Sequence, residues 1–237
     1  MEGRVAADHD PPSVARRGVQ GDAPAMAEIR AAQLKEDLLA LAELGSDVAS
    51  CVLAEVHPVT LRRIVLATRV DWLPAGLNVE LAHAGHAVLG DARLQRWGRV
   101  SVRRSMKSSL LGPILRGTIG VFGLSPAAIF RAVPAAYNTA YRHCGEMVVS
   151  AAEERVRRVE LRGLPPVLQD RCFLLAMAGA LEGVFDACDH QGKARLVSTA
   201  VGDRVEFEAT WLPRAPLPGR RDPAGRARPA PRRDPAP

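Results

Sequence analysis

The sequence predicts an α+β protein: a helical N-terminal layer followed by a ββαββ unit, whose strands form a four-stranded antiparallel sheet packed on helices. Two observations support this prediction. Apolar residues recur at helical spacing over much of residues 26–143, and residues 144–211 contain two pairs of strand-like segments around one apolar helical segment. A helical region followed by a compact unit of strands is typical of α+β folds.

Three helices are expected early in the chain. They cover residues 26–44, a short segment beginning at His57-Pro58, and residues 77–89. Gly45 and Gly90 end the first and the last of these helices, and Pro58 suits the first turn of the middle one, because its fixed φ is already helical. Residues 71–74 interrupt the pattern, so we expect a break there.

The next region is less regular. Gly98 weakens the helical pattern of residues 91–107, and glycines and a proline interrupt the apolar run of residues 110–122. Ser125-Pro126 is a strong helix start, since serine is a favoured N-cap and proline is favoured at the first helical position. The helix that begins there is expected to end at Gly145.

The predicted strands comprise an apolar run at 147–149 and residues 155–162, 194–201 and 205–211. The last two flank a Gly202-Asp203 turn, and the strict alternation after the turn predicts a hairpin. Residues 167–188 predict a buried helix between the strand pairs. Gly179 and Gly183 share one face of this helix, and since glycine lowers helix stability, we expect them to permit close packing against a sheet.

Composition separates a foldable core from two tails. The chain has 237 residues, 47% of them hydrophobic and only 4% aromatic, so its core must consist mainly of Ala, Leu and Val. Most of the net charge of +6 lies in residues 213–237, where seven arginines face two aspartates among many prolines. This composition predicts disorder there and in residues 1–24, and Met26 offers an alternative start. A single α+β domain is expected over residues 25–212.

Residues 92–145 contain no acidic residue. A basic face is therefore expected, formed by Arg93, Arg96, Arg99, Arg103, Arg104 and Lys107. Such a face suits an adaptor that binds nucleic acid or an acidic protein through residues 92–145. The alternative is that the acidic flanks of the same domain neutralise it, or that it is merely a solvated face.

The sequence favours a cytoplasmic protein without a membrane span. The first ten residues include Glu2, Asp8 and Asp10, whereas a signal peptide needs a basic start, and no run of 18 apolar residues occurs. The four cysteines, Cys51, Cys144, Cys172 and Cys188, form no Cys-x-x-Cys motif, which fits a reducing compartment.

A mixed cluster near residue 140 is the best candidate for a ligand pocket. The pocket residues that we predict are Phe130, Tyr137, Tyr141, His143, Cys144, Phe173 and Met177. Tyr, His and Cys together suit the lining of a small-molecule site. A structural explanation is also open, because Arg142 and His143 at a helix end would complement the helix dipole without any ligand.

The sequence offers no reaction centre. His83 and His86 are spaced to share a metal on one helix face, but two ligands do not make a site, so no metal is expected. Ser105, Ser108 and Ser109 lack any nucleophile motif or phosphate loop. We therefore expect the protein not to be an enzyme.

The order of elements from Ser125 onward resembles a known superfamily: 4-vinyl reductase domains, haem-NO-binding domains and TRAPP transport subunits. More narrowly, residues 71–74, residues 123–126 and the terminal strand at residues 207–211 resemble an uncharacterised bacterial paralogue family near that superfamily. The resemblance covers about residues 55–211. It implies a non-catalytic sensor or adaptor that binds a small apolar ligand or a protein partner, such as a second copy of the chain.

The same resemblance leads us to expect no cofactor. The haem-binding relatives carry a proximal histidine and a Tyr-x-Ser-x-Arg motif. Residues 137–141 read Tyr-Asn-Thr-Ala-Tyr and lack the serine and the arginine, so haem is not expected.

Overall fold

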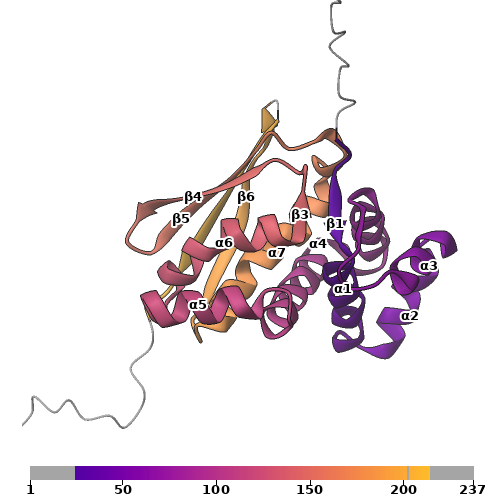
Figure 1. The fold of residues 1–237 in the computed structure, drawn as a ribbon, viewed down its shortest axis with the longest axis horizontal. Coiled ribbons are helices and arrows are strands. Elements are labelled where there is room, and N and C mark those ends of the chain that lie inside the picture. The colour runs from indigo at the N-terminus through magenta and orange to yellow at the C-terminus, as the bar shows by residue number, and fades with distance from the viewer. Residues whose placement is uncertain (1–24, 202, 214–237) are drawn as a thin grey trace, which may run out of the picture.

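The computed structural model describes residues 25–201 and 203–213. It shows a group of helices beside a four-stranded sheet, with further helices under one face of the sheet (Figure 1). The α+β class, the helical first part and the antiparallel sheet packed on helices are confirmed. The tails predicted to be disordered, residues 1–24 and nearly all of 213–237, lie outside the described residues.

The helical layer consists of α1 (Ala31–Glu43), α2 (Ser46–Glu55), α3 (Pro58–Leu66) and the long α4 (Gly76–Lys107). Helix α3 begins as expected, with His57 as the N-cap and Pro58 directly after it. The predicted helix end at Gly90 corresponds to a non-helical residue, where two helical segments of α4 meet at a kink. Gly90 takes φ 68° and ψ 177°, and a second helical segment begins directly after it, which the sequence does not predict as a continuation of the first.

The first predicted helix begins later than expected. Residues Glu28–Arg30 form the strand β1, which lies between β2 (Trp72–Pro74) and β3 (Tyr141–Arg142) in a small antiparallel sheet. Ile29 is fully buried there, and its periodicity alone could not distinguish a buried strand from a helical turn. The predicted break at residues 71–74 is thus the partner strand of β1.

Helices α5 (Gly112–Phe122) and α6 (Pro126–Ala140) follow. The start of α6 is confirmed: Ser125 is the N-cap, and its hydroxyl accepts a hydrogen bond from the Ala128 amide at 3.2 Å. Its end is earlier than predicted, because Tyr141 leaves the helix to pair with β1.

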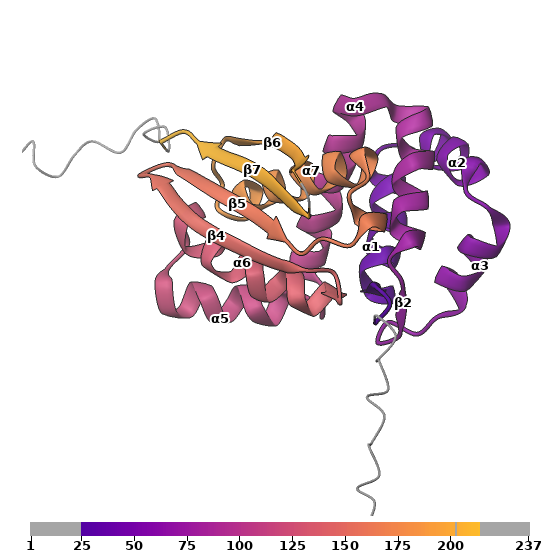
Figure 2. The ribbon, with the colours of Figure 1, turned by 90° about the horizontal axis from the view of Figure 1, so that it is seen from above.

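The main sheet has the order β4-β5-β7-β6, with β4 (Glu146–Glu153), β5 (Val156–Arg162), β6 (Gly192–Val201) and β7 (Arg204–Trp211). Helix α7 (Arg171–Ala187) connects the two strand pairs after the short 3-10 turn η1 (Pro166–Leu168). Figure 2 shows the sheet with α5, α6 and α7 beneath it and its other face uncovered. The inward residues Val205, Phe207 and Ala209 are fully buried.

The uncovered face of the sheet is lined with ion pairs, most of them between strands. Glu160 is only 6% exposed and contacts Arg162 and Arg204, each at 2.7 Å. Arg158 pairs with Glu206, and Arg195 pairs with Glu208. These pairs allow a face rich in charge to remain in water while the opposite face is apolar.

Glycines bring α4 and α7 into direct backbone contact. A β-carbon at Gly179 would overlap the carbonyl oxygen of Gln95, and one at Gly183 would lie 2.9 Å from that of Arg99. On the other helix, a β-carbon at Gly98 would overlap the carbonyl oxygen of Ala176. The prediction that Gly179 and Gly183 mean close contact is right, but the partner is a helix and not a sheet.

Two apolar clusters meet at this helix pair. One includes Phe130, Phe185 and Phe207 under the main sheet, and the other includes Leu41, Leu81 and Trp97 within the helical layer. Adjacent residues of α7 belong to different clusters, Cys172 to the helical one and Phe173 to the sheet one. Within the described ranges, no helix is both long and apolar enough to cross a membrane.

Candidate functional site

A cavity of about 120 Å³ lies between the helical layer and the helices under the sheet. Its wall is mostly apolar, as expected of a small-molecule site. The lining comes from α1, α4, α6, α7, β3 and β4, and includes Trp97, Val102, Met106, Val133, Ala136, Ala140, Met147, Ala180, Leu181 and Val184. The lining also holds three methionines, Met106, Met147 and Met177, which make it adaptable in shape because thioether chains are flexible and polarisable.

Four of the seven predicted pocket residues line this cavity: Tyr137, Tyr141, Phe173 and Met177. The two tyrosine rings stack with centroids 4.8 Å apart, and the Tyr141 ring meets Phe173 edge-on at 6.1 Å. The Tyr137 hydroxyl donates to the Cys144 carbonyl at 2.8 Å. Burial raises the pKa of both phenols, so both remain protonated at neutral pH.

The other three predicted residues lie elsewhere. Phe130 is fully buried against Phe185 and Trp211 in the core under the sheet. Cys144 is buried, its thiol faces the backbone carbonyls of Glu28 and Arg142, and burial raises its pKa to about 11. His143 is exposed at a positive φ of 55°, in the turn between β3 and β4. The prediction assumes that the helix continues to Gly145, so that residues 141–144 would follow helical spacing. In the turn, the side chains of neighbouring residues point in different directions.

A buried polar network forms one side of the cavity, and its centre is Asp37, only 6% exposed. Its carboxylate accepts hydrogen bonds from Gln33 at 2.9 Å, from Asn78 at 2.9 Å and from the Ser101 hydroxyl. The Trp97 indole donates to the Asp37 backbone carbonyl at 2.8 Å. Every donor of the network thus has an acceptor. A carboxylate can accept about four hydrogen bonds, so Asp37 can accept one more after these three.

Burial raises the pKa of Asp37 from 3.8 to about 6, although hydrogen bonds from Ser101, Gln33 and Asn78 act in the opposite direction. The neighbouring Glu36 adds to the increase. The negative charge of Asp37 also contributes to the raised pKa of Tyr141, so the two side chains interact electrostatically. Among the described residues, the Tyr141 hydroxyl has no hydrogen-bond partner.

The cavity can therefore hold an apolar molecule with one polar end. Apolar walls would enclose the body, and the Tyr141 hydroxyl and the Asp37 carboxyl are available for a single polar group. Sequence reasoning missed Gln33, Asp37, Asn78 and Ser101. The signal that was present is the pair Gln33 and Asp37, four residues apart on the buried face of an amphipathic helix.

Half of the predicted basic face is paired with acids of the same fold. Arg99 contacts Asp186 at 2.5 Å, Arg103 contacts Glu43 at 2.7 Å, and Arg104 contacts Glu43 at 2.5 Å and Glu36 at 3.2 Å. Arg93, Arg96 and Lys107 are exposed, with no ion pair among the described residues. An adaptor function through residues 92–145 stays a prediction, with fewer free charges than the sequence indicates.

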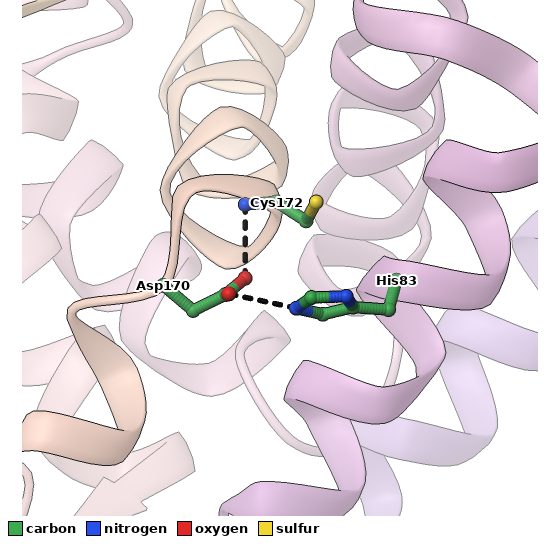
Figure 3. Close-up of side chains that lie close together, drawn as sticks. All are labelled: His83, Asp170 and Cys172. Atoms are coloured by element: carbon green, nitrogen blue, oxygen red, sulfur yellow. Dashed lines mark hydrogen bonds and ion pairs between the residues drawn. The ribbon is translucent and has the colours of Figure 1, made fainter.

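A second cluster of reactive side chains joins α4 to the start of α7. Figure 3 shows His83 from α4 directed at Asp170, with Cys172 close by. The His83 Nε2 and Asp170 Oδ2 atoms are 2.7 Å apart, and the other Asp170 oxygen accepts from the amides of Cys172 and Phe173. His86, which the sequence groups with His83, pairs instead with Asp91 at 2.7 Å.

Comparison with known proteins shows similarity in structure only. No protein-family model and no curated protein sequence matches the chain. The structure resembles the Fe(II) unliganded H-NOX protein from K. algicida, with a TM-score of 0.51, 14% identity and coverage of 78% of this chain and 97% of that one. It also resembles an oxygen-binding H-NOX domain related to soluble guanylate cyclases, with a TM-score of 0.54, 7% identity and coverage of 77% and 95%.

These similarities correct the expectation that the chain takes no cofactor and that haem is unlikely. Another similar structure is described by its modulation of haem redox potential through protein-induced porphyrin distortion. Its TM-score is 0.52 at 8% identity, and the match covers 77% of this chain and 99% of that one. The chain therefore shares its fold with haem domains, and differences from a short motif at residues 137–141 do not exclude haem.

The cavity does not fit a porphyrin at its present size. About 120 Å³ is close to the roughly 150 Å³ of an apolar cavity that holds benzene. Among the described histidines none lines it, and its potential iron ligands are the thioethers of Met106, Met147 and Met177 and the two phenols. Haem would require α6 or α7 to move away from α4. What the comparisons establish is the fold, which is that of H-NOX domains.

Proposed function

We propose that this protein is a non-catalytic sensor module that binds a small, mainly apolar molecule between its helical layer and its sheet. The observation that carries the proposal is the apolar cavity, with the unpaired Tyr141 hydroxyl and the buried Asp37 carboxyl on its wall. The similarity of the fold to domains described as binding oxygen supports the same class of function. The ligand would be about the size of benzene or smaller, with one hydrogen-bonding group.

A sensor accounts for the site better than an enzyme does. The two phenols of the cavity have raised pKa values because they are buried, which keeps them protonated and poorly nucleophilic. Burial has the same effect on the pKa of the Cys144 thiol, which lies outside the cavity. We propose the cytoplasm as the compartment, because the four cysteines are free thiols.

We also propose a distant relation to 4-vinyl reductase domains and TRAPP subunits, on the order of elements alone.

Binding of benzene and of phenol to the purified full chain tests the cavity. Phenol should bind about fivefold more tightly than benzene, because one net hydrogen bond contributes roughly 1 kcal/mol. Ala136→Phe should reduce binding of both at least about tenfold by filling the cavity. The matched control is Ala135→Phe, an exposed neighbour on the same helix that does not line the cavity. Ligand-detected NMR and calorimetry give the affinities.

A titration with haemin, followed in the visible spectrum, decides the size of the ligand. If one equivalent of haemin binds to the wild type and to Ala135→Phe but not to Ala136→Phe, the site is right and the proposed size is wrong. If Ala136→Phe binds phenol as tightly as the wild type does, the cavity is not the binding site.

A further inference from the structure

We infer that His83, Asp170 and Cys172 form a binding site for a divalent metal ion of the zinc type. One ligand atom from each residue lies within 4.8 Å of the other two. An imidazole nitrogen, a carboxylate oxygen and a thiolate sulfur are the three kinds of ligand that zinc takes in proteins. The site is separate from the cavity and does not depend on the proposed sensor function.

The geometry needs only a small adjustment. Zinc bond lengths of about 2.0 to 2.3 Å place tetrahedral ligand atoms roughly 3.3 to 3.8 Å apart. The hydrogen-bonded Nε2 and Oδ2 atoms, now 2.7 Å apart, would separate slightly, and the widest pair would move closer. The His83 side chain is 58% exposed, so it can rotate without disturbing the core.

Two ligands are already held in place. Asp170 caps α7, because its Oδ1 accepts from the Cys172 amide at 2.9 Å and from the Phe173 amide at 3.0 Å. This leaves Oδ2 for the metal and fixes the carboxylate in the manner of an outer-shell hydrogen bond. Cys172 is 8% exposed and fixed in the first turn of α7.

The charges balance when the metal binds. The positive end of the α7 dipole opposes a cation, but the Asp170 carboxylate and a Cys172 thiolate together neutralise two positive charges. A cysteine binds zinc only as its thiolate. Binding of one Zn²⁺ would break the Cys172 S–H bond, and that proton would pass to solvent while the sulfur–zinc bond forms. The hydrogen between His83 Nε2 and Asp170 Oδ2 would move to Nδ1 or to solvent, because Nε2 then gives its electron pair to zinc. Water would occupy the fourth position.

The nearest arginine does not occupy the proposed metal site. Arg171 follows Asp170, yet its guanidinium pairs with Asp91 at 2.5 Å and 3.0 Å, on the side of His86. His86 and Asp91 thus form a separate ion-pair group one turn along α4. This arrangement departs from the sequence-based expectation of no metal site, because His83 has its partners on α7 and not at His86.

Cobalt(II) added to the full chain after chelator treatment is the direct test. We expect one equivalent to bind, with a thiolate-to-cobalt charge-transfer band and a tetrahedral visible spectrum. Cys172→Ser should remove the charge-transfer band, and His83→Ala should lower the affinity for zinc at least about 100-fold. Both positions tolerate the change, since serine is close in size to cysteine and His83 is exposed; circular dichroism checks the folding.

The controls are chosen from the same chain. His86→Ala, one turn away on α4, and Cys51→Ser, which removes the exposed thiol, should both retain one equivalent of metal. Calorimetry in two buffers of different ionisation enthalpy should report at least one proton released for each zinc bound. Less than one equivalent of metal in the wild type, a band that survives Cys172→Ser, or equal losses in His83→Ala and His86→Ala would each overturn the inference.

Discussion

Replacing Gly179 by alanine should destabilise the protein by more than about 4 kcal/mol, enough to prevent stable folding in an ordinary domain. The added β-carbon would overlap the carbonyl oxygen of Gln95, which belongs to the backbone of α4 and cannot rotate away. Relief requires α4 and α7 to separate along their whole contact. Both apolar clusters meet at this contact, so the damage would not remain local.

Urea denaturation, followed by circular dichroism, measures the loss. Gly98→Ala tests the same contact from the other helix, since its β-carbon would overlap the Ala176 carbonyl oxygen. The matched control is Gly117→Ala in α5, where a β-carbon meets nothing within 4 Å. That change should stabilise the protein by up to about 1 kcal/mol through helix propensity. Wild-type stability in Gly179→Ala would contradict the described packing of α4 on α7.

Asp37 should make the protein less stable as the pH rises from about 4 to about 6. Its pKa is 3.8 when unfolded and about 6 when folded, because burial disfavours the charged carboxylate. A group with a raised folded pKa contributes its full stability below the unfolded pKa, and this contribution is lost as the pH rises through the folded pKa. A shift of roughly two pKa units corresponds to about 3 kcal/mol.

The comparison of wild type with Asp37→Asn isolates this effect. The stability of the wild type relative to Asp37→Asn should fall between pH 4 and pH 6 and remain constant above pH 7. The asparagine keeps the shape but does not titrate. Urea denaturation at half-unit pH intervals provides the measurement.

Asp71→Asn is the control for this titration, because the pKa of Asp71 is lowered by its hydrogen bond to Thr68 and not raised. Its stability difference from wild type should therefore stay constant between pH 4 and pH 6. A constant difference for Asp37→Asn over the same interval would show that Asp37 titrates normally.

The sequence predicts those parts of the fold that depend on neighbours in the chain. The hairpin of β6 and β7 follows from the turn signal and the strict alternation after it, and the start of α6 follows from Ser125 and Pro126. The glycine pair of α7 predicts a close contact correctly. It does not identify α4 as the partner, because a missing side chain carries no information about what approaches it.

The remaining features depend on residues that are distant in sequence. Asp37 bonds to Ser101, 64 residues later, and His83 meets Asp170, 87 residues later. Each residue alone resembles an ordinary polar position on a helix. The expectation about haem failed for a related reason, since a short motif is compared position by position, while the fold is shared at 7% identity.

The strand β1 has a consequence for the order of folding. Glu28 pairs with Arg142, 114 residues later, so β1 takes its place between β2 and β3 only after almost all of the helices have been synthesised. Closing a loop of this length is slow, and the short strand β1 forms few hydrogen bonds that would offset the entropy lost. We expect this small sheet to form last and to open first, with its amide protons exchanging before those of β7. Tyr141 belongs to the same sheet, so completion of the cavity wall coincides with the last step of folding.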